Sequence, residues 1–260
     1  MKNLIKSHMY QLSKSALAKL VCFCCLFIAA VNFMSEYNYY DGKYTVGRFI
    51  VEYGFTVLCM AVMLSVMLVG IICDMDFIDK TANYELMSGY TRKQSYFSKV
   101  IISLIVGMIA YIIMLAVPVV LGSIISDFGY ELSIKEVIIR ALVSVFPAIR
   151  IMCEFICIGF IIRNPYVIMG CGFLISVLGE MLPMIVSNPE SIFLGLTCFF
   201  RLSQYESWTT YTLADTVNLI HVYGLRLTGD AVAEIIISSL LIGAFFILIG
   251  YTFYKRDDLR

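Results

Sequence analysis

Three charged side chains lie well inside apolar segments of this 260-residue chain, in contrast to Lys19 and Arg140 near segment ends, and they are the first candidates for chemistry. Arg150 and Glu154 are four residues apart, so a helix would place them on one face, where they can form an ion pair. Glu180 follows in the next apolar segment. Charges inside membrane helices either line a substrate path or pair with one another in the packed interior. We favour the packing pair, with a polar substrate path as the alternative.

The residue patterns of known catalytic and metal sites are missing. The two histidines, His8 and His221, cannot form the HExxH pair of a metalloprotease, and no GxSxG nucleophile motif occurs. Cys153 and Cys157 would share a helix face but lack two further ligands for a tetrahedral metal site. No GxxxxGK(S/T) phosphate loop is present, so the chain cannot hydrolyse ATP by that route. We expect no enzyme active site, no metal and no cofactor in this chain, so any uphill transport would draw on another polypeptide.

The composition indicates a membrane protein. Hydrophobic residues make up 60% of the chain and charged residues 15%, whereas soluble domains are about 45–50% apolar and about 25% charged. The mean hydropathy is +0.88. Nineteen basic residues balance nineteen acidic ones without a basic tract, so we expect no nucleic-acid partner. Nine cysteines, an odd number, argue against a disulfide-stapled secreted domain.

Six apolar stretches approach the ~20 residues that a transmembrane helix needs. We therefore predict an all-α integral membrane protein, with residues 1–260 forming one transmembrane domain in the lipid bilayer. The predicted spans are residues 16–34, 53–73, 100–126, 137–162, 166–186 and 235–254. Twelve Lys and Arg residues lie on one side of this layout and six on the other, which predicts that both termini are cytoplasmic. No small-residue cleavage site follows the first apolar stretch, so we expect it to be retained.

The segments outside the spans carry further expectations. We predict that residues 1–15 form an amphipathic helix that lies in the plane of the lipid headgroups. Its apolar face would carry Leu4, Ile5, Met9, Leu12 and Ala16. The alternative is a basic leader that only sets the topology. Residues 163–165 are so short a link that spans four and five must form an antiparallel hairpin. Residues 187–234 form the extracytoplasmic link, whose apolar run at 192–200 fits an interfacial or partly re-entrant helix.

The cytoplasmic segment at residues 74–99 is the most informative part of the chain. Several of its residues are too apolar for a simple solvated loop. Gly89 suits a helix C-cap, and Thr91 followed by Gln94 matches a capping box that would begin a new helix. We predict a short helix, a turn and a fresh helix that leads into the membrane. A structured loop that merely joins two spans is the alternative.

These features together resemble the permease subunits of type-2 ATP-binding-cassette (ABC) exporters, particularly small bacterial ones linked to antimicrobial-peptide export or immunity. The resemblance covers the whole chain and rests on its layout and on residues 253–259, a Phe-Tyr-Lys-Arg-Asp-Asp-Leu ending. In the family, the cytoplasmic segment carries an acidic residue, a Gly, a Ser/Thr-Arg pair and a Lys. The residues at these places here are Glu85, Gly89, Thr91, Arg92 and Lys99, with Tyr90 where many members have Pro.

The resemblance implies that residues 77–87 form a coupling helix that docks on a separate ATPase subunit, which binds ATP and Mg²⁺. Two permease subunits, identical or related, would form the pathway as a dimer in a bacterial cytoplasmic membrane. The implied substrate is a hydrophobic peptide, a lipid-like compound or an antibiotic. The competing interpretation is a stand-alone channel, or a sensory or assembly protein, without ATP coupling. The residues that the resemblance assigns to ATPase coupling are Phe77, Ile78, Asp79, Tyr84, Glu85, Leu86, Gly89 and Arg92.

Overall fold

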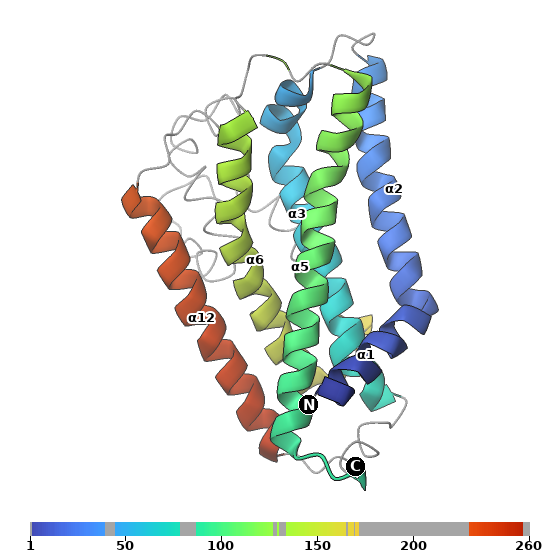
Figure 1. The fold of residues 1–260 in the computed structure, drawn as a ribbon, viewed down its shortest axis with the longest axis vertical. Helices are drawn as coiled ribbons and strands as arrows, with labels where there is room; N and C mark the ends of the chain where they lie inside the picture. The colour runs from blue at the N-terminus through green and yellow to red at the C-terminus, as the bar shows by residue number, and fades with distance from the viewer. Residues whose placement is uncertain are drawn as a thin grey trace.

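The described part of the protein is a bundle of long helices (Figure 1). The computed structural model describes residues 2–39, 45–78, 87–126, 129, 134–164, 166–168, 170–171 and 229–256, and no strand occurs among them. The long helices of this part are α1 (Lys2–Lys14), α2 (Ala16–Tyr39), α3 (Val46–Ile78), α5 (Arg92–Ile125), α6 (Ile134–Ile162) and α12 (Gly229–Arg256).

Three of these helices are long and apolar enough to cross a membrane. The qualifying stretches are Ala16–Ser35 in α2, Arg92–Ile125 in α5 and Ala141–Ile162 in α6. Two shorter apolar stretches, Met60–Cys73 and Ser239–Lys255, lie in α3 and α12. The chain is therefore an all-helical protein of membrane type in its described residues. Most of the predicted fifth span lies outside those residues, and the six-span layout with cytoplasmic termini stays a prediction.

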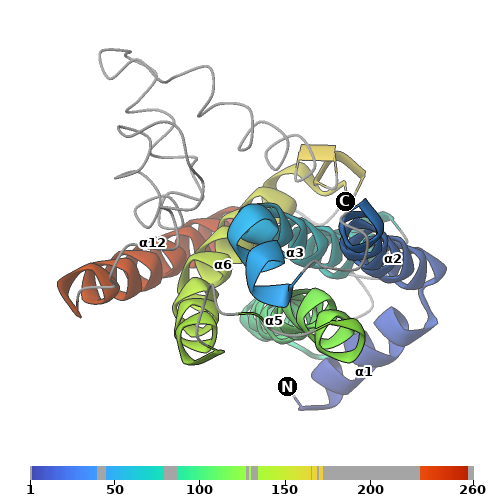
Figure 2. The ribbon, with the colours of Figure 1, turned by 90° about the horizontal axis from the view of Figure 1, so that it is seen from above.

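Helix α3 lies at the centre of the bundle. It packs against α2, α5 and α6, while α12 packs mainly along α6 (Figure 2). The interior includes Leu64, Tyr111 and Phe155, which are buried. On the outward faces, large apolar side chains such as Phe27 and Leu241 are exposed, which suits contact with lipid chains rather than water.

Most of the helices are longer than the spans that we predicted. Helix α3 continues without a break to Ile78, whereas we predicted that span two ends at residue 73 and that a new helix begins at Phe77. Phe77 and Ile78 are thus the last residues of α3. No Gly or Pro stands between Cys73 and Ile78, so nothing in the local sequence breaks the helix there. Helix α5 begins at Arg92, eight residues before the predicted span at Val100, as the predicted capping box at Thr91 requires.

The predicted start of α5 is confirmed in detail. Gly89 has a φ of +87°, which a residue with a Cβ rarely adopts, so the chain turns there. The backbone N–H of Gln94 donates to Thr91 Oγ1 at 3.3 Å, and the backbone N–H of Thr91 donates to Gln94 Oε1 at 3.0 Å. Together these two bonds make a capping box that fixes the first turn of α5.

The predicted turn after α6 is also tight. Arg163 has a φ of +57°, and its N–H donates to the carbonyl oxygen of Gly159 at 2.8 Å, which ends α6. The Asn164 side chain then accepts the N–H of Tyr166 at 3.0 Å and caps a new helical turn at residues 166–168. The chain therefore changes direction directly after Ile162, whereas the predicted antiparallel hairpin of spans four and five stays a prediction, because most of span five lies outside the described residues.

Helix α1 lies at the end of the bundle where α5 begins (Figure 1) and packs against α5 and α2. It is amphipathic as predicted, but its buried face is rotated from the expected one. Leu4 and His8 are buried and Leu12 is half-buried, whereas Met9 is exposed. The buried side of α1 therefore consists of Leu4, His8 and Leu12, which are spaced four residues apart. Hydropathy alone would place His8 on the polar side.

Candidate functional site

The ion pair expected from the spacing of Arg150 and Glu154 is present on α6. Arg150 Nε lies 3.2 Å from Glu154 Oε1. The Arg150 side chain is only 3% exposed and that of Glu154 is 18% exposed. The pair lies within the apolar stretch of α6 that is long enough to cross a membrane, where isolated charges are costly. Glu180, the third charge that we singled out, lies outside the described residues.

Helix α12 packs closely against the face of α6 that carries this pair. A Cβ added at Gly243 of α12 would lie 3.5 Å from Cys153 Sγ and 3.7 Å from Arg150 Cα. An added Cβ at these distances would make ordinary van der Waals contact, so the backbone of α12 lies close to α6 at this glycine. The backbone of α6 at Arg150 thus lies at a packed boundary with α12, and the choice between a packing pair and a substrate path stays a prediction.

The same boundary is closest at Gly250, where α5 joins the other two helices. A Cβ at Gly250 would lie 2.8 Å from Tyr96 Oη of α5 and 3.3 Å from Cys157 Cα of α6. The Tyr96 hydroxyl donates to the carbonyl oxygen of Ile247 at 2.7 Å. A hydroxyl of α5 is therefore bonded directly to the backbone of α12 in the space that the glycine leaves.

Further contacts fasten the start of α5 to the end of α12. The Tyr96, Phe160 and Tyr254 rings form a cluster with centroid separations of 4.7 to 5.6 Å, which joins α5, α6 and α12. Ser95 Oγ and Tyr254 Oη are hydrogen bonded at 3.0 Å. Arg92 Nη1 donates to the carbonyl oxygen of Lys255 at 2.9 Å. We call Arg92, Ser95, Tyr96, Phe160, Tyr254 and Lys255 the α5–α12 junction.

Polar side chains also hold the inner faces of α3 and α5 together. The Ser65 hydroxyl donates to the carbonyl oxygen of Gly107 at 2.9 Å. Cys73 Sγ and Ser103 Oγ are 3.4 Å apart. Lys99, which the family resemblance singled out, is fully buried on α5. Serine and cysteine contacts of this kind fix the register of helices whose other contacts are apolar and non-directional.

The eight residues assigned to ATPase coupling are only partly described. Asp79, Tyr84, Glu85 and Leu86 lie outside the described residues. Phe77 and Ile78 end α3, Gly89 forms the turn before α5, and Arg92 belongs to the α5–α12 junction. The structure therefore brings both flanks of the predicted coupling segment to the same end of the bundle.

Sequence reasoning missed Ser95, Tyr96 and Tyr254, which make most of the contacts in the junction. One signal could have found Tyr254: it precedes Lys255 and Arg256 at the end of an apolar run, a position that favours amphipathic aromatic residues. No comparable signal marks Ser95.

Among the described residues, no group of three or more His, Cys, Asp or Glu side chains could hold a metal ion. No protein-family model matches the chain, and no curated protein matches it.

Proposed function

We propose that this chain is the membrane-spanning permease subunit of an ABC exporter in a bacterial cytoplasmic membrane. Two such subunits, identical or related, form the pathway, and a separate ATPase subunit binds ATP and Mg²⁺. The substrate is a hydrophobic peptide, a lipid-like compound or an antibiotic. The chain carries no phosphate loop of its own, so the work comes from the partner.

One observation carries this proposal: the α5–α12 junction directly follows the predicted coupling segment. That segment leaves α3 at Ile78 and returns through the capping box at Thr91 into the first turn of α5. In the same turn, Arg92 and Ser95 are bonded to the last turn of α12. A force applied to the segment would therefore reach α5 and α12 together.

The long helices would carry such a force across the membrane. Helix α5 has 34 residues, which corresponds to about 51 Å at 1.5 Å per residue. Helix α6 would move with α12, because Gly243 and Gly250 keep these helices in close contact over two helical turns. A docked ATPase that closes on ATP could in this way tilt three helices as a unit.

The test is purification of the protein from its native cells in mild detergent, followed by identification of co-eluting proteins and an ATPase assay. We expect a stoichiometric ATPase subunit and ATP hydrolysis. Tyr84→Ala and Glu85→Lys should remove both while the helical content, measured by circular dichroism, is unchanged. Tyr166→Ala is the matched control, because this tyrosine is 62% exposed beyond the end of α6.

The opposite results would overturn the proposal. A clean, folded preparation without an ATPase partner and without hydrolysis would favour a stand-alone channel or a sensory protein. If the Tyr84 and Glu85 variants retained the partner as well as the Tyr166 variant does, the coupling segment would be wrongly assigned.

A further inference from the structure

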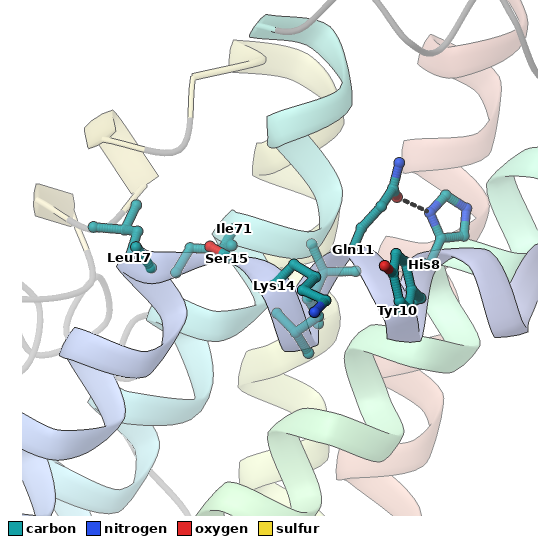
Figure 3. Close-up of a pocket in the computed structure, with 10 residues that line it drawn as sticks. His8, Tyr10, Gln11, Lys14, Ser15, Leu17 and Ile71 are labelled. Carbon is teal, nitrogen blue, oxygen red and sulfur yellow. Dashed lines mark hydrogen bonds between the residues drawn. The ribbon is translucent and has the colours of Figure 1, made fainter.

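A cavity of about 480 Å³ lies between α1 and α3, next to the turn where α1 becomes α2 (Figure 3). Small-molecule sites in proteins have volumes of about 300–1,000 Å³, so the cavity is large enough for a ligand or for part of one. Its walls come from the second half of α1, the first residues of α2, and Ile71 and Ile72 of α3.

The lining of the cavity is divided into an apolar part and a cationic part. Leu12, Leu17, Ile71 and Ile72 supply aliphatic side chains. Lys14 supplies the positive charge, and the described lining contains no Asp or Glu. This division matches a ligand that has a negative head and a hydrocarbon tail.

The polar side of the cavity is ordered by contacts within α1. Lys14 Nζ lies 5.6 Å from the centroid of the Tyr10 ring, a cation–π distance that keeps the ammonium near the rim. His8 Nδ1 and Gln11 Oε1 are hydrogen bonded at 3.3 Å (Figure 3). The cationic rim is therefore held by its neighbours before any ligand arrives.

The position of the cavity along the fold suggests where the ligand comes from. Ser15 separates α1 from α2, and its Oγ accepts the N–H of Ala18 at 3.3 Å, which caps the start of α2. Helix α2 is one of the three helices long enough to cross a membrane, and α1 is an amphipathic helix that precedes it. The cavity thus lies where a spanning helix meets an interfacial one, at the level of lipid headgroups.

We propose that this cavity binds an anionic phospholipid of the surrounding membrane. The phosphate lies at Lys14, and the first carbons of one acyl chain lie against Leu12, Leu17, Ile71 and Ile72. A free phosphate would use only the cationic rim, whereas a neutral lipid would use only the apolar wall. The proposal depends on the membrane character of the chain and not on its role in transport.

The test uses the purified full-length protein in lipid nanodiscs that contain trace photoactivatable phosphatidylglycerol or phosphatidylcholine with the same acyl chains. We expect crosslinks from phosphatidylglycerol to map to residues 12–17 and 71–72. Lys14→Gln should reduce this labelling about fivefold, the effect of one lysine charge at an anionic membrane surface. Lys14→Arg should retain it. Lys6→Gln is the matched control, because Lys6 is exposed on the same helix but does not line the cavity.

Circular dichroism would show that each variant remains helical. Three results would overturn the proposal. Equal labelling by phosphatidylcholine and phosphatidylglycerol would show that the cavity does not select charge. Equal loss in the Lys14→Gln and Lys6→Gln variants would assign the effect to the general charge of α1. Competition by glycerol phosphate, which has no acyl chain, would assign the cavity to a soluble phosphate compound.

Discussion

Replacement of Arg150 and Glu154, singly and together, distinguishes a packing pair from a transport residue. We choose methionine for both positions because it is unbranched, apolar and of similar length. Arg150→Met removes a charge from a side chain that is 3% exposed, and Glu154→Met removes one from a side chain that is 18% exposed. The third variant carries both changes and leaves no charge at either position.

The geometry sets the expected magnitudes. Two unit charges at the 3.2 Å separation of this contact attract by about 5 kcal/mol at an effective dielectric constant of 20, before the cost of removing them from water is subtracted. Measured coupling between contacting residues is about 0.5–3 kcal/mol. We expect a coupling free energy of about 1–3 kcal/mol. Glu154→Met should destabilise more than Arg150→Met, because a buried carboxyl can take up a proton whereas a guanidinium cannot lose one.

The assay is unfolding of the purified variants in mixed micelles with increasing dodecyl sulfate, followed by circular dichroism. The double variant should lose less stability than the sum of the two single variants, since replacement of a whole buried pair by apolar residues is often neutral. Lys135→Met is the control, because Lys135 is exposed on the same helix. Its free energy of unfolding should stay within about 0.5 kcal/mol of the original value.

A coupling free energy below about 0.5 kcal/mol, with two nearly neutral single variants, would refute this reasoning. The contact between the two side chains would then add nothing to the packing of α6 against α12. If those stable variants also lost ATP-driven transport, Arg150 and Glu154 would belong to the substrate path, the alternative that the sequence left open.

Substitutions at three further positions test the elements around the junction. Thr91→Ala should lower stability by about 1 kcal/mol through loss of the capping box, and Thr91→Ser should restore it in thermal unfolding. Gly250→Ala should lower the Tm despite its better helix propensity, because the added Cβ displaces the Tyr96 hydroxyl, at a cost of about 1–3 kcal/mol. Tyr254→Phe removes the bond to Ser95 and should cost about 0.6–1.7 kcal/mol by the same measurement.

Features that depend on neighbouring residues were predictable from the sequence. The capping box at Thr91, the tight turn at Arg163 and the pairing of Arg150 with Glu154 all involve residues within five positions of one another. Their geometry follows from the helix itself, so one sequence is enough. The apolar stretches of α2, α5 and α6 were found for a similar reason, since composition alone identifies a segment that suits lipid.

Features that depend on which helices meet could not be predicted in this way. Hydropathy marks where a helix is apolar and not where it ends, so the extension of α3 to Ile78 was missed. His8 is buried because α1 packs against α5 and α2. The sequence of α1 alone does not show which of its sides these helices cover. Tyr96 and Ile247 are 151 positions apart, and only the packing of α5 on α12 brings them together.

The placement of directional contacts indicates which helices have to keep a fixed register. Lipid chains compete poorly for hydrogen bonds, so a hydroxyl shared between helices fixes their relative positions in a way that apolar contacts cannot. Two side-chain contacts of α5 to α12, at Ser95 and Tyr96, lie within one turn of the capping box. The large apolar side chains on the outer face of α2 carry no such constraint. A partner that docks at the predicted coupling segment, residues 77–87, would therefore act first on α5 and α12. It would act on α2 only through apolar packing.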